Sequence, residues 1–108
     1  MGLVVAPIIG GQLEAWKSWS AELTGSKKSD WDDFNHRYGL TRHDVWLAET
    51  PGGPMAVVFH EGPGADTFMQ ELGQSDHSFD NWVVSSLEAF HNMNLSEPPP
   101  GPMPVRMI

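Results

Sequence analysis

The chain has 108 residues, enough for one domain with a single modest core and too few for two. Its 14 acidic and 6 basic residues give a formal net charge of −8, which disfavours binding to nucleic-acid phosphates or to an anionic membrane surface. Because cysteine is absent, disulfides and cysteine metal sites are excluded, and a reducing, cytoplasmic location is expected. No apolar run approaches the roughly 20 residues that span a bilayer. We therefore expect a single domain over residues 1–108, without nucleic-acid or membrane binding.

The first part of the chain predicts a strand followed by helix. Residues 3–9 are apolar and rich in β-branched side chains, and a pair of glycines ends the run, as expected for a buried strand. Over residues 12–23 the apolar positions recur at helical spacing. The pattern breaks at residues 24–26 and then resumes until Gly39, a residue suited to ending a helix. The spacing predicts either one long kinked helix or two shorter ones.

Residues 43–62 predict a β-hairpin whose arms are apolar on both sets of alternating positions. With Gly52-Gly53 at the tip, Leu47 faces Val58 and Trp46 faces Phe59. Alternate residues of a strand point to opposite sides, so this register separates two faces. One face carries Val45, Leu47, Glu49, Ala56, Val58 and His60, and the other carries Trp46, Ala48, Met55, Val57 and Phe59. Neither face is suited to water.

The remainder of the chain predicts more helix and a last strand. A short helical piece holds Phe68 and Leu72, and residues 79–90 carry an apolar stripe at i, i+3, i+4, i+8 and i+11, with Ser86 at i+7. Residues 98–102 are rich in proline and predict a stiff connector, and residues 105–108 predict a closing strand. The resulting order indicates an α+β, ferredoxin-like βαββαβ fold, in which helices cover one face of a four-stranded antiparallel sheet.

The uncovered face of such a sheet would expose apolar side chains to water. The economical solution is a homodimer through the sheet faces, because one self-complementary surface then protects both copies. Trp46, Val57 and Phe59 are the residues we expect at that interface.

Several segments resemble the dimeric α/β-barrel superfamily: PIIGGQLEAWKSW, TRHDVWLAETPGG, SDHSFDNWVVSSLEAFHNMNL and the terminal PPPGP. Within it they look like a group of small uncharacterised bacterial proteins. The resemblance implies two ferredoxin-like subunits packed sheet to sheet, with a ligand cavity between helices and sheet in each. More distant relatives include cofactor-independent antibiotic-biosynthesis-type monooxygenases, polyketide cyclases, haem-degrading enzymes and EthD-type proteins. The haem-degrading pattern places an asparagine on the first strand, and residues 3–9 contain none.

Three groups of side chains could carry chemistry or bind a ligand. His91 lies at the margin of the apolar stripe of the last helix, where it could reach a pocket or only the helix end. Glu49 and His60 share a hairpin face and could form a polar pair, or could sit at strand ends in solvent. We expect these three as candidate catalytic residues. Trp16, Trp82 and Phe90 are the expected lining of a pocket, with ordinary core packing as the alternative.

Asp76, His77 and Asp80 lie close in sequence but lack a recognised metal-ligand spacing, and a helix cap explains them equally well. We therefore expect neither a metal nor a cofactor. Two functions remain open. The first is a small-molecule-binding protein for a hydrophobic metabolite, which includes a cofactor-independent monooxygenase or cyclase. The alternative is a non-enzymatic structural or interaction module forming a homodimer, which predicts a cavity packed shut by aromatic side chains.

Overall fold

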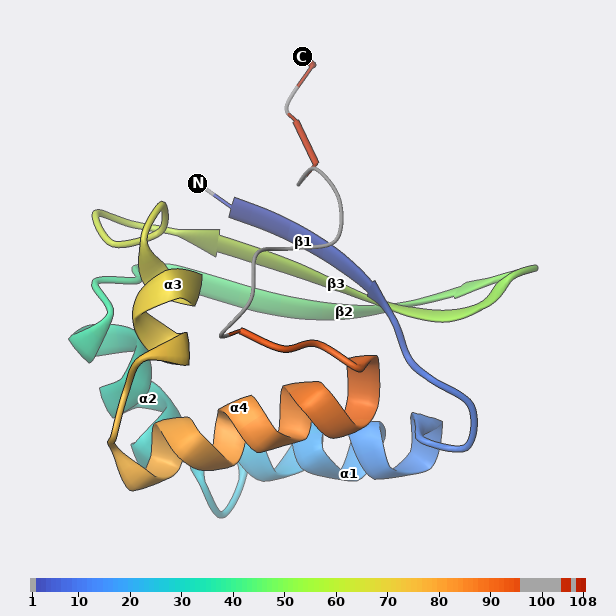
Figure 1. Cartoon of the computed structure of the whole chain (residues 1–108), viewed down its shortest axis with the longest axis horizontal. Helices are drawn as coiled ribbons and strands as arrows, with labels where there is room; N and C mark the ends of the chain where they lie inside the picture. The colour runs from blue at the N-terminus through green and yellow to red at the C-terminus, as the bar shows by residue number, and fades with distance from the viewer. Residues whose placement is uncertain (1, 96–103, 106) are drawn as a thin grey trace.

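The computed structural model describes residues 2–95, 104–105 and 107–108. Within these residues the chain forms three strands and four helices, and all the helices lie on one side of the sheet (Figure 1). In chain order the elements are β1 (Gly2–Pro7), α1 (Leu13–Thr24), α2 (Lys28–Arg37), β2 (Arg42–Thr50), β3 (Gly53–Glu61), α3 (Phe68–Gly73) and α4 (Ser78–His91).

The sheet is antiparallel with the order β1-β3-β2, so the second arm of the hairpin is its central strand. Val58 of β3 pairs with Val4 on one side and with Val45 on the other, which places these three side chains on the same face. Val4 and Ala56 on this face are buried against the helices. The α+β class is therefore confirmed.

The expectation of a four-stranded ferredoxin-like sheet is wrong, because the described sheet has three strands. Val105, Met107 and Ile108 belong to no strand, and each is at least 75% exposed. Arg106 and the predicted connector at residues 98–102 lie outside the described residues. The described apolar side chains of this segment bury almost no surface, so little free energy would offset the cost of ordering a strand there.

The predicted hairpin faces are confirmed, but the predicted register is shifted by two residues. The tip is Pro51-Gly52, and Leu47 faces Ala56 where Val58 was expected. The Thr50 hydroxyl stabilises this turn, since Oγ1 donates to the Gly53 carbonyl at 2.8 Å and accepts from the Gly52 amide at 3.2 Å. A shift by an even number of residues keeps every side chain on its face, so the two apolar faces remain as predicted.

The helical region before the hairpin is two helices, α1 and α2, which meet at residues 25–27. The helix predicted from the apolar stripe at residues 79–90 is confirmed as α4. Its N-cap is His77, whose Nδ1 accepts a hydrogen bond from the Phe79 amide at 3.2 Å. The helices pack aromatic side chains into one core with the sheet, and Phe34 of α2 is completely buried at its centre. Phe34 contacts Phe68 and Phe79 edge to face, which joins α2 to α3 and α4.

A buried carboxylate joins α2 to α4 beside this aromatic core. Asp80 is 0% exposed and accepts hydrogen bonds from both terminal guanidinium nitrogens of Arg37, at 2.7 and 3.0 Å. The hydroxyls of Tyr38 and Ser75 also donate to it, at 2.6 and 2.7 Å. Burial alone would raise the pKa of Asp80, but these hydrogen bonds outweigh it and lower the pKa to about 2. Asp80 is therefore a structural ion, not a solvated cap residue.

Asp80→Asn should lower the free energy of unfolding by about 2–4 kcal/mol, because the amide cannot match the charge of Arg37 or accept the same set of donors. Urea denaturation measures this loss. Asp33→Asn is the matched control, since Asp33 binds the same guanidinium from an exposed position and should cost less than about 1 kcal/mol. Equal losses in the two variants would show that Asp80 does not join the helices.

Candidate functional site

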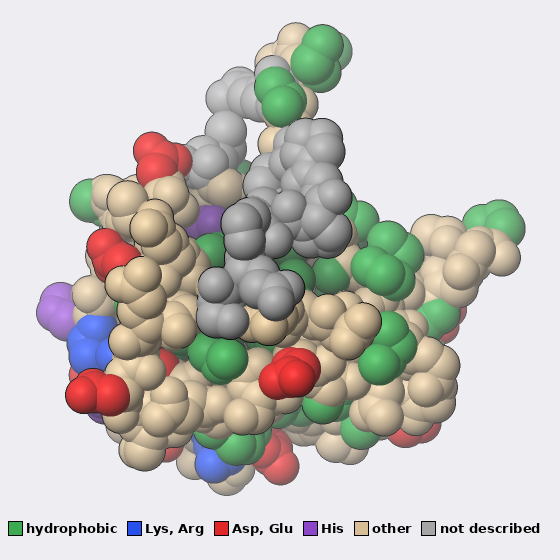
Figure 2. Space-filling view, viewed as in Figure 1, with side chains coloured by type: hydrophobic (Ala, Val, Ile, Leu, Met, Phe, Trp, Pro, Cys, Tyr) green, Lys and Arg blue, Asp and Glu red, His purple; other side chains and the backbone are tan. Residues whose placement is uncertain are grey.

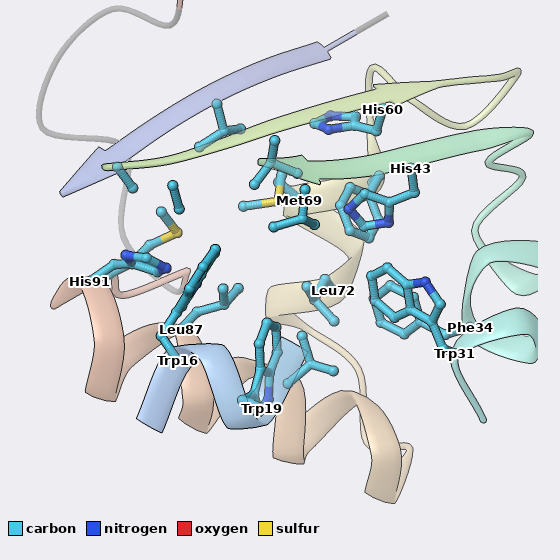
Figure 3. Close-up of a pocket in the computed structure, with 18 residues that line it drawn as sticks. Trp16, Trp19, Trp31, Phe34, His43, His60, Met69, Leu72, Leu87 and His91 are labelled. Atoms are coloured by element: carbon cyan, nitrogen blue, oxygen red, sulfur yellow. The ribbon is translucent and has the colours of Figure 1, made fainter. Parts of the chain in front are cut away.

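A cavity of about 60 Å³ lies between the sheet and the helices (Figure 3). Its walls are almost entirely apolar and aromatic, and they come from all three strands and all four helices of the described fold. The labelled lining residues in Figure 3 are Trp16, Trp19, Trp31, Phe34, His43, His60, Met69, Leu72, Leu87 and His91. Ligand pockets typically measure about 300–1,000 Å³, so this cavity alone is too small for an organic metabolite.

A larger open groove of about 680 Å³ runs beside the cavity, between α1, the start of α2 and the edge strand β2. It exists because the helices do not fully cover β2: Val45 and Leu47 point to the helical side yet are 36% and 37% exposed. Trp16, Trp31, His43 and Val45 line both the groove and the cavity. These four side chains therefore form the wall between the two spaces.

His43 stands at this wall and is held in place by two contacts. Its Nδ1 lies 2.9 Å from Oδ1 of Asn35, and its ring lies 4.6 Å from the ring of Trp31. Because Oδ1 is an acceptor, Nδ1 carries the proton and Nε2 keeps its lone pair. Burial, with a smaller contribution from the neighbouring His60, lowers the pKa of His43 to about 4. His43 is therefore neutral near pH 7.

His60 pairs with His43 across the hairpin, and the two rings lie 6.0 Å apart. It is only 3% exposed, and a side chain at Gly2 would collide with its imidazole. Burial lowers the pKa of His60, and a hydrogen bond with the Ala65 backbone acts in the opposite direction. No atom in the described part of the chain meets hydrogen-bonding geometry with its Nδ1, which leaves a buried polar atom without a partner beside the cavity.

His91 lies at the opposite end of the cavity from His43 and His60 (Figure 3). Its Nδ1 donates to the Pro7 carbonyl at 2.9 Å, which joins the end of α4 to the end of β1. Burial lowers the pKa of His91, opposed by this hydrogen bond. The position is that of a helix-end residue that also borders the cavity.

Glu49 is not close to either candidate histidine. It is exposed near the hairpin tip and pairs with Pro54, whereas His60 pairs with His43 at the other end of the ladder. Six residues of strand separate these two pairs, a distance of about 20 Å. The structure therefore does not assemble the predicted polar pair.

The predicted pocket residues separate into two groups. Trp16 lines both the cavity and the groove. Trp82 packs against Trp19 at 5.8 Å, and Phe90 is a buried core residue 5.6 Å from Trp19, but neither lines the two spaces described above. His43 was missed. Its alternation with Val45 along β2 already placed it on the helical face.

The sheet face away from the helices carries the predicted interface residues. Trp46 is 60% exposed, and Val57 and Phe59 on the adjacent strand are half-buried. The guanidinium of Arg42 lies 4.9 Å from the centre of the Phe59 ring. Figure 2 shows acidic side chains mainly over the helices. Asp44 pairs with Phe59 on this same face and binds Arg42 at 2.6 Å, so charged side chains border its apolar surface at that end.

Among the described residues, no group of three or more histidines, aspartates and glutamates is arranged to hold a metal ion. None of the helices in the same residues has the length and apolar character required to cross a membrane. Comparisons with known proteins find no matching family model, no similar curated protein and no similar solved structure. The resemblance to a group of dimeric α/β-barrel proteins stays a prediction from the sequence.

The neutral state of His43 predicts a pH dependence of stability. Its folded-state pKa of about 4 lies below the ordinary value of 6.5, so the unfolded chain binds the proton first. Above about pH 6.5 the neutral His43 makes its whole contribution to the free energy of unfolding. This contribution should fall by on the order of 3 kcal/mol as the pH drops to about 4. Urea denaturation across this range should show a shallower slope for His43→Phe than for the unmodified protein. Parallel slopes would mean that folding does not lower the pKa of His43.

Proposed function

We propose that this protein binds a small, largely apolar aromatic molecule in the groove along β2, without catalysing a reaction on it. The observation that supports this most directly is the wall of Trp16, Trp31, His43 and Val45, which borders the open groove on one side and the smaller cavity on the other. Indole and imidazole rings offer flat faces against which an aromatic ligand can stack. The groove volume of about 680 Å³ falls within the usual range for ligand sites.

The arrangement of polar groups favours binding over turnover. A monooxygenase or cyclase would need an acid or base beside its substrate, and the candidates Glu49, His60 and His91 lie apart from one another. His43 adjoins the groove, but a pKa of about 4 makes its imidazole a weak base at neutral pH. These features support a binding role for the site.

The groove can be tested by filling it. Val45→Trp should reduce the affinity for naphthalene at least tenfold, because the larger ring occupies the wall between groove and cavity. Isothermal titration calorimetry measures the affinity, and chemical-shift changes of the indole N–H groups locate the ligand. Val5→Trp is the matched control, since Val5 is also exposed on a strand but points away from the helices. Equal affinities in both variants, or no binding to the unmodified protein, would contradict the proposal.

A second candidate function, a homodimeric interaction module, is supported by the uncovered sheet face. Leu3, Val5 and Trp46 are exposed there, and apolar side chains of the central strand lie between them. We propose that a second copy covers this face about a twofold axis. Each subunit carries a net charge of −8, which opposes association, but the centre of the face is uncharged and would meet the same apolar surface. Dimerisation and groove binding use different faces of the sheet and can coexist.

Trp46→Glu should convert such a dimer to a monomer, because it would bury a carboxylate in an apolar interface. Light scattering at 50 μM reports the mass, with Ala89→Glu on the exposed surface of α4 as a control of equal charge. A monomeric unmodified protein at this concentration would refute the homodimer.

A further inference from the structure

We infer, on the basis of the groove-binding function proposed above, that the ligand is an uncharged aromatic molecule with a hydroxyl group that enters the cavity between His43 and His60. Its ring system would occupy the groove over Trp16 and Trp31. Three observations support this inference: the room available on each side of the wall, the unused hydrogen-bonding capacity of the two imidazoles, and the absence of charge from the described cavity lining.

The two spaces suit different parts of one molecule. A water-sized group needs about 10–15 Å³ of such space, whereas an engineered cavity that accepts benzene measures about 150 Å³. The cavity of about 60 Å³ can therefore take a hydroxyl and a few adjoining atoms but not a whole ring. The groove of about 680 Å³ has room for a fused pair of rings. A ligand that spans the wall would insert its small polar end and leave its aromatic body outside.

The polar end has two imidazoles to meet. The bond to Asn35 leaves Nε2 of His43 as a hydrogen-bond acceptor, and Nδ1 of His60 is buried without a partner. The centres of the two rings lie 6.0 Å apart, and a hydroxyl oxygen with two hydrogen bonds of about 2.8 Å at a tetrahedral angle joins nitrogens about 4.6 Å apart, a separation that the facing edges of two such rings can provide. A hydroxyl can donate to one nitrogen and accept from the other, whereas a methyl group of similar size can do neither. Leaving His60 unpaired in the occupied state would retain its desolvation cost.

Lys17 and Asp44 line the groove, but the cavity that would take the polar end of the ligand argues against an ionised group there. No aspartate, glutamate, lysine or arginine lines the cavity within the described residues. Both histidines have lowered pKa values and are neutral near pH 7, so neither would compensate a carboxylate or an ammonium group. An aromatic alcohol supplies the required hydrogen bond without bringing an unpaired charge into the apolar interior.

The test compares 2-naphthol with 2-methylnaphthalene, two ligands of nearly equal shape that differ in a hydroxyl and a methyl group. We expect 2-naphthol to bind the unmodified protein at least fivefold more tightly in calorimetric titrations at pH 7. Equal affinities would overturn the inference while leaving the groove-binding function intact. Failure of both compounds to bind would instead contradict the groove-binding function itself, so the two failures are distinguishable.

The histidines are tested with His43→Phe and His60→Phe, which keep an aromatic ring and remove the nitrogens. Each should abolish most of the preference for 2-naphthol while binding of 2-methylnaphthalene persists. His36→Phe, on the exposed surface of α2, is the control and should keep the full preference. If a variant does not fold, the NMR chemical shifts of the imidazole nitrogens are measured in the unmodified protein instead. A shift of the His43 and His60 signals with 2-naphthol alone supports the inference, and unchanged signals in saturated protein refute it.

Discussion

The ion pair between Asp80 and Arg37 is the interaction on which the arrangement of the helices depends. Asp80 has no contact with water and accepts four hydrogen bonds, from Arg37, Tyr38 and Ser75. A buried carboxylate is tolerated only when its charge and lone pairs are matched in this way. Because Arg37 and Tyr38 lie at the end of α2 while Asp80 lies in the first turn of α4, the network fixes these helices relative to each other.

That fixed pair of helices determines how the sheet is covered. Phe34 packs beneath the network against Phe68 and Phe79, so the aromatic core concentrates under the ends of the strands that carry His43 and His60. Helix α1 does not extend far enough over the edge strand to bury Val45 and Leu47. The groove is the consequence of this incomplete cover. Its exposed valine and leucine side chains would gain free energy from contact with an apolar ligand.

The histidines acquire their properties from the same packing. In an exposed strand, His43 and His60 would be ordinary titrating residues, but burial among aromatic rings keeps both neutral. Asn35, one residue after Phe34 in α2, orients His43, whereas nothing in the described chain occupies Nδ1 of His60. The contrast between the paired Nδ1 of His43 and the unpaired Nδ1 of His60 distinguishes this end of the cavity from the end at His91, where Pro7 accepts the ring proton.

The sequence by itself determined the helices, the first three strands and the faces of the hairpin, because these follow from local periodicity. The apolar spacing identified α4, the break at residues 24–26 marked a kink or a helix boundary that the structure shows to be a boundary, and strict alternation sorted Val45 from Trp46. An even shift of the register left that sorting unchanged.

Tertiary structure alone decided the contacts between residues distant in the chain. The pairing of His43 with His60 depends on a two-residue shift set by the Thr50 turn, and the Arg37–Asp80 pair joins residues 43 positions apart. The expected fourth strand is absent from the described residues because it, too, depended on contacts with residues distant in the chain. An apolar segment such as residues 105–108 becomes a strand only where the rest of the fold offers it surface to bury, and its described residues remain exposed.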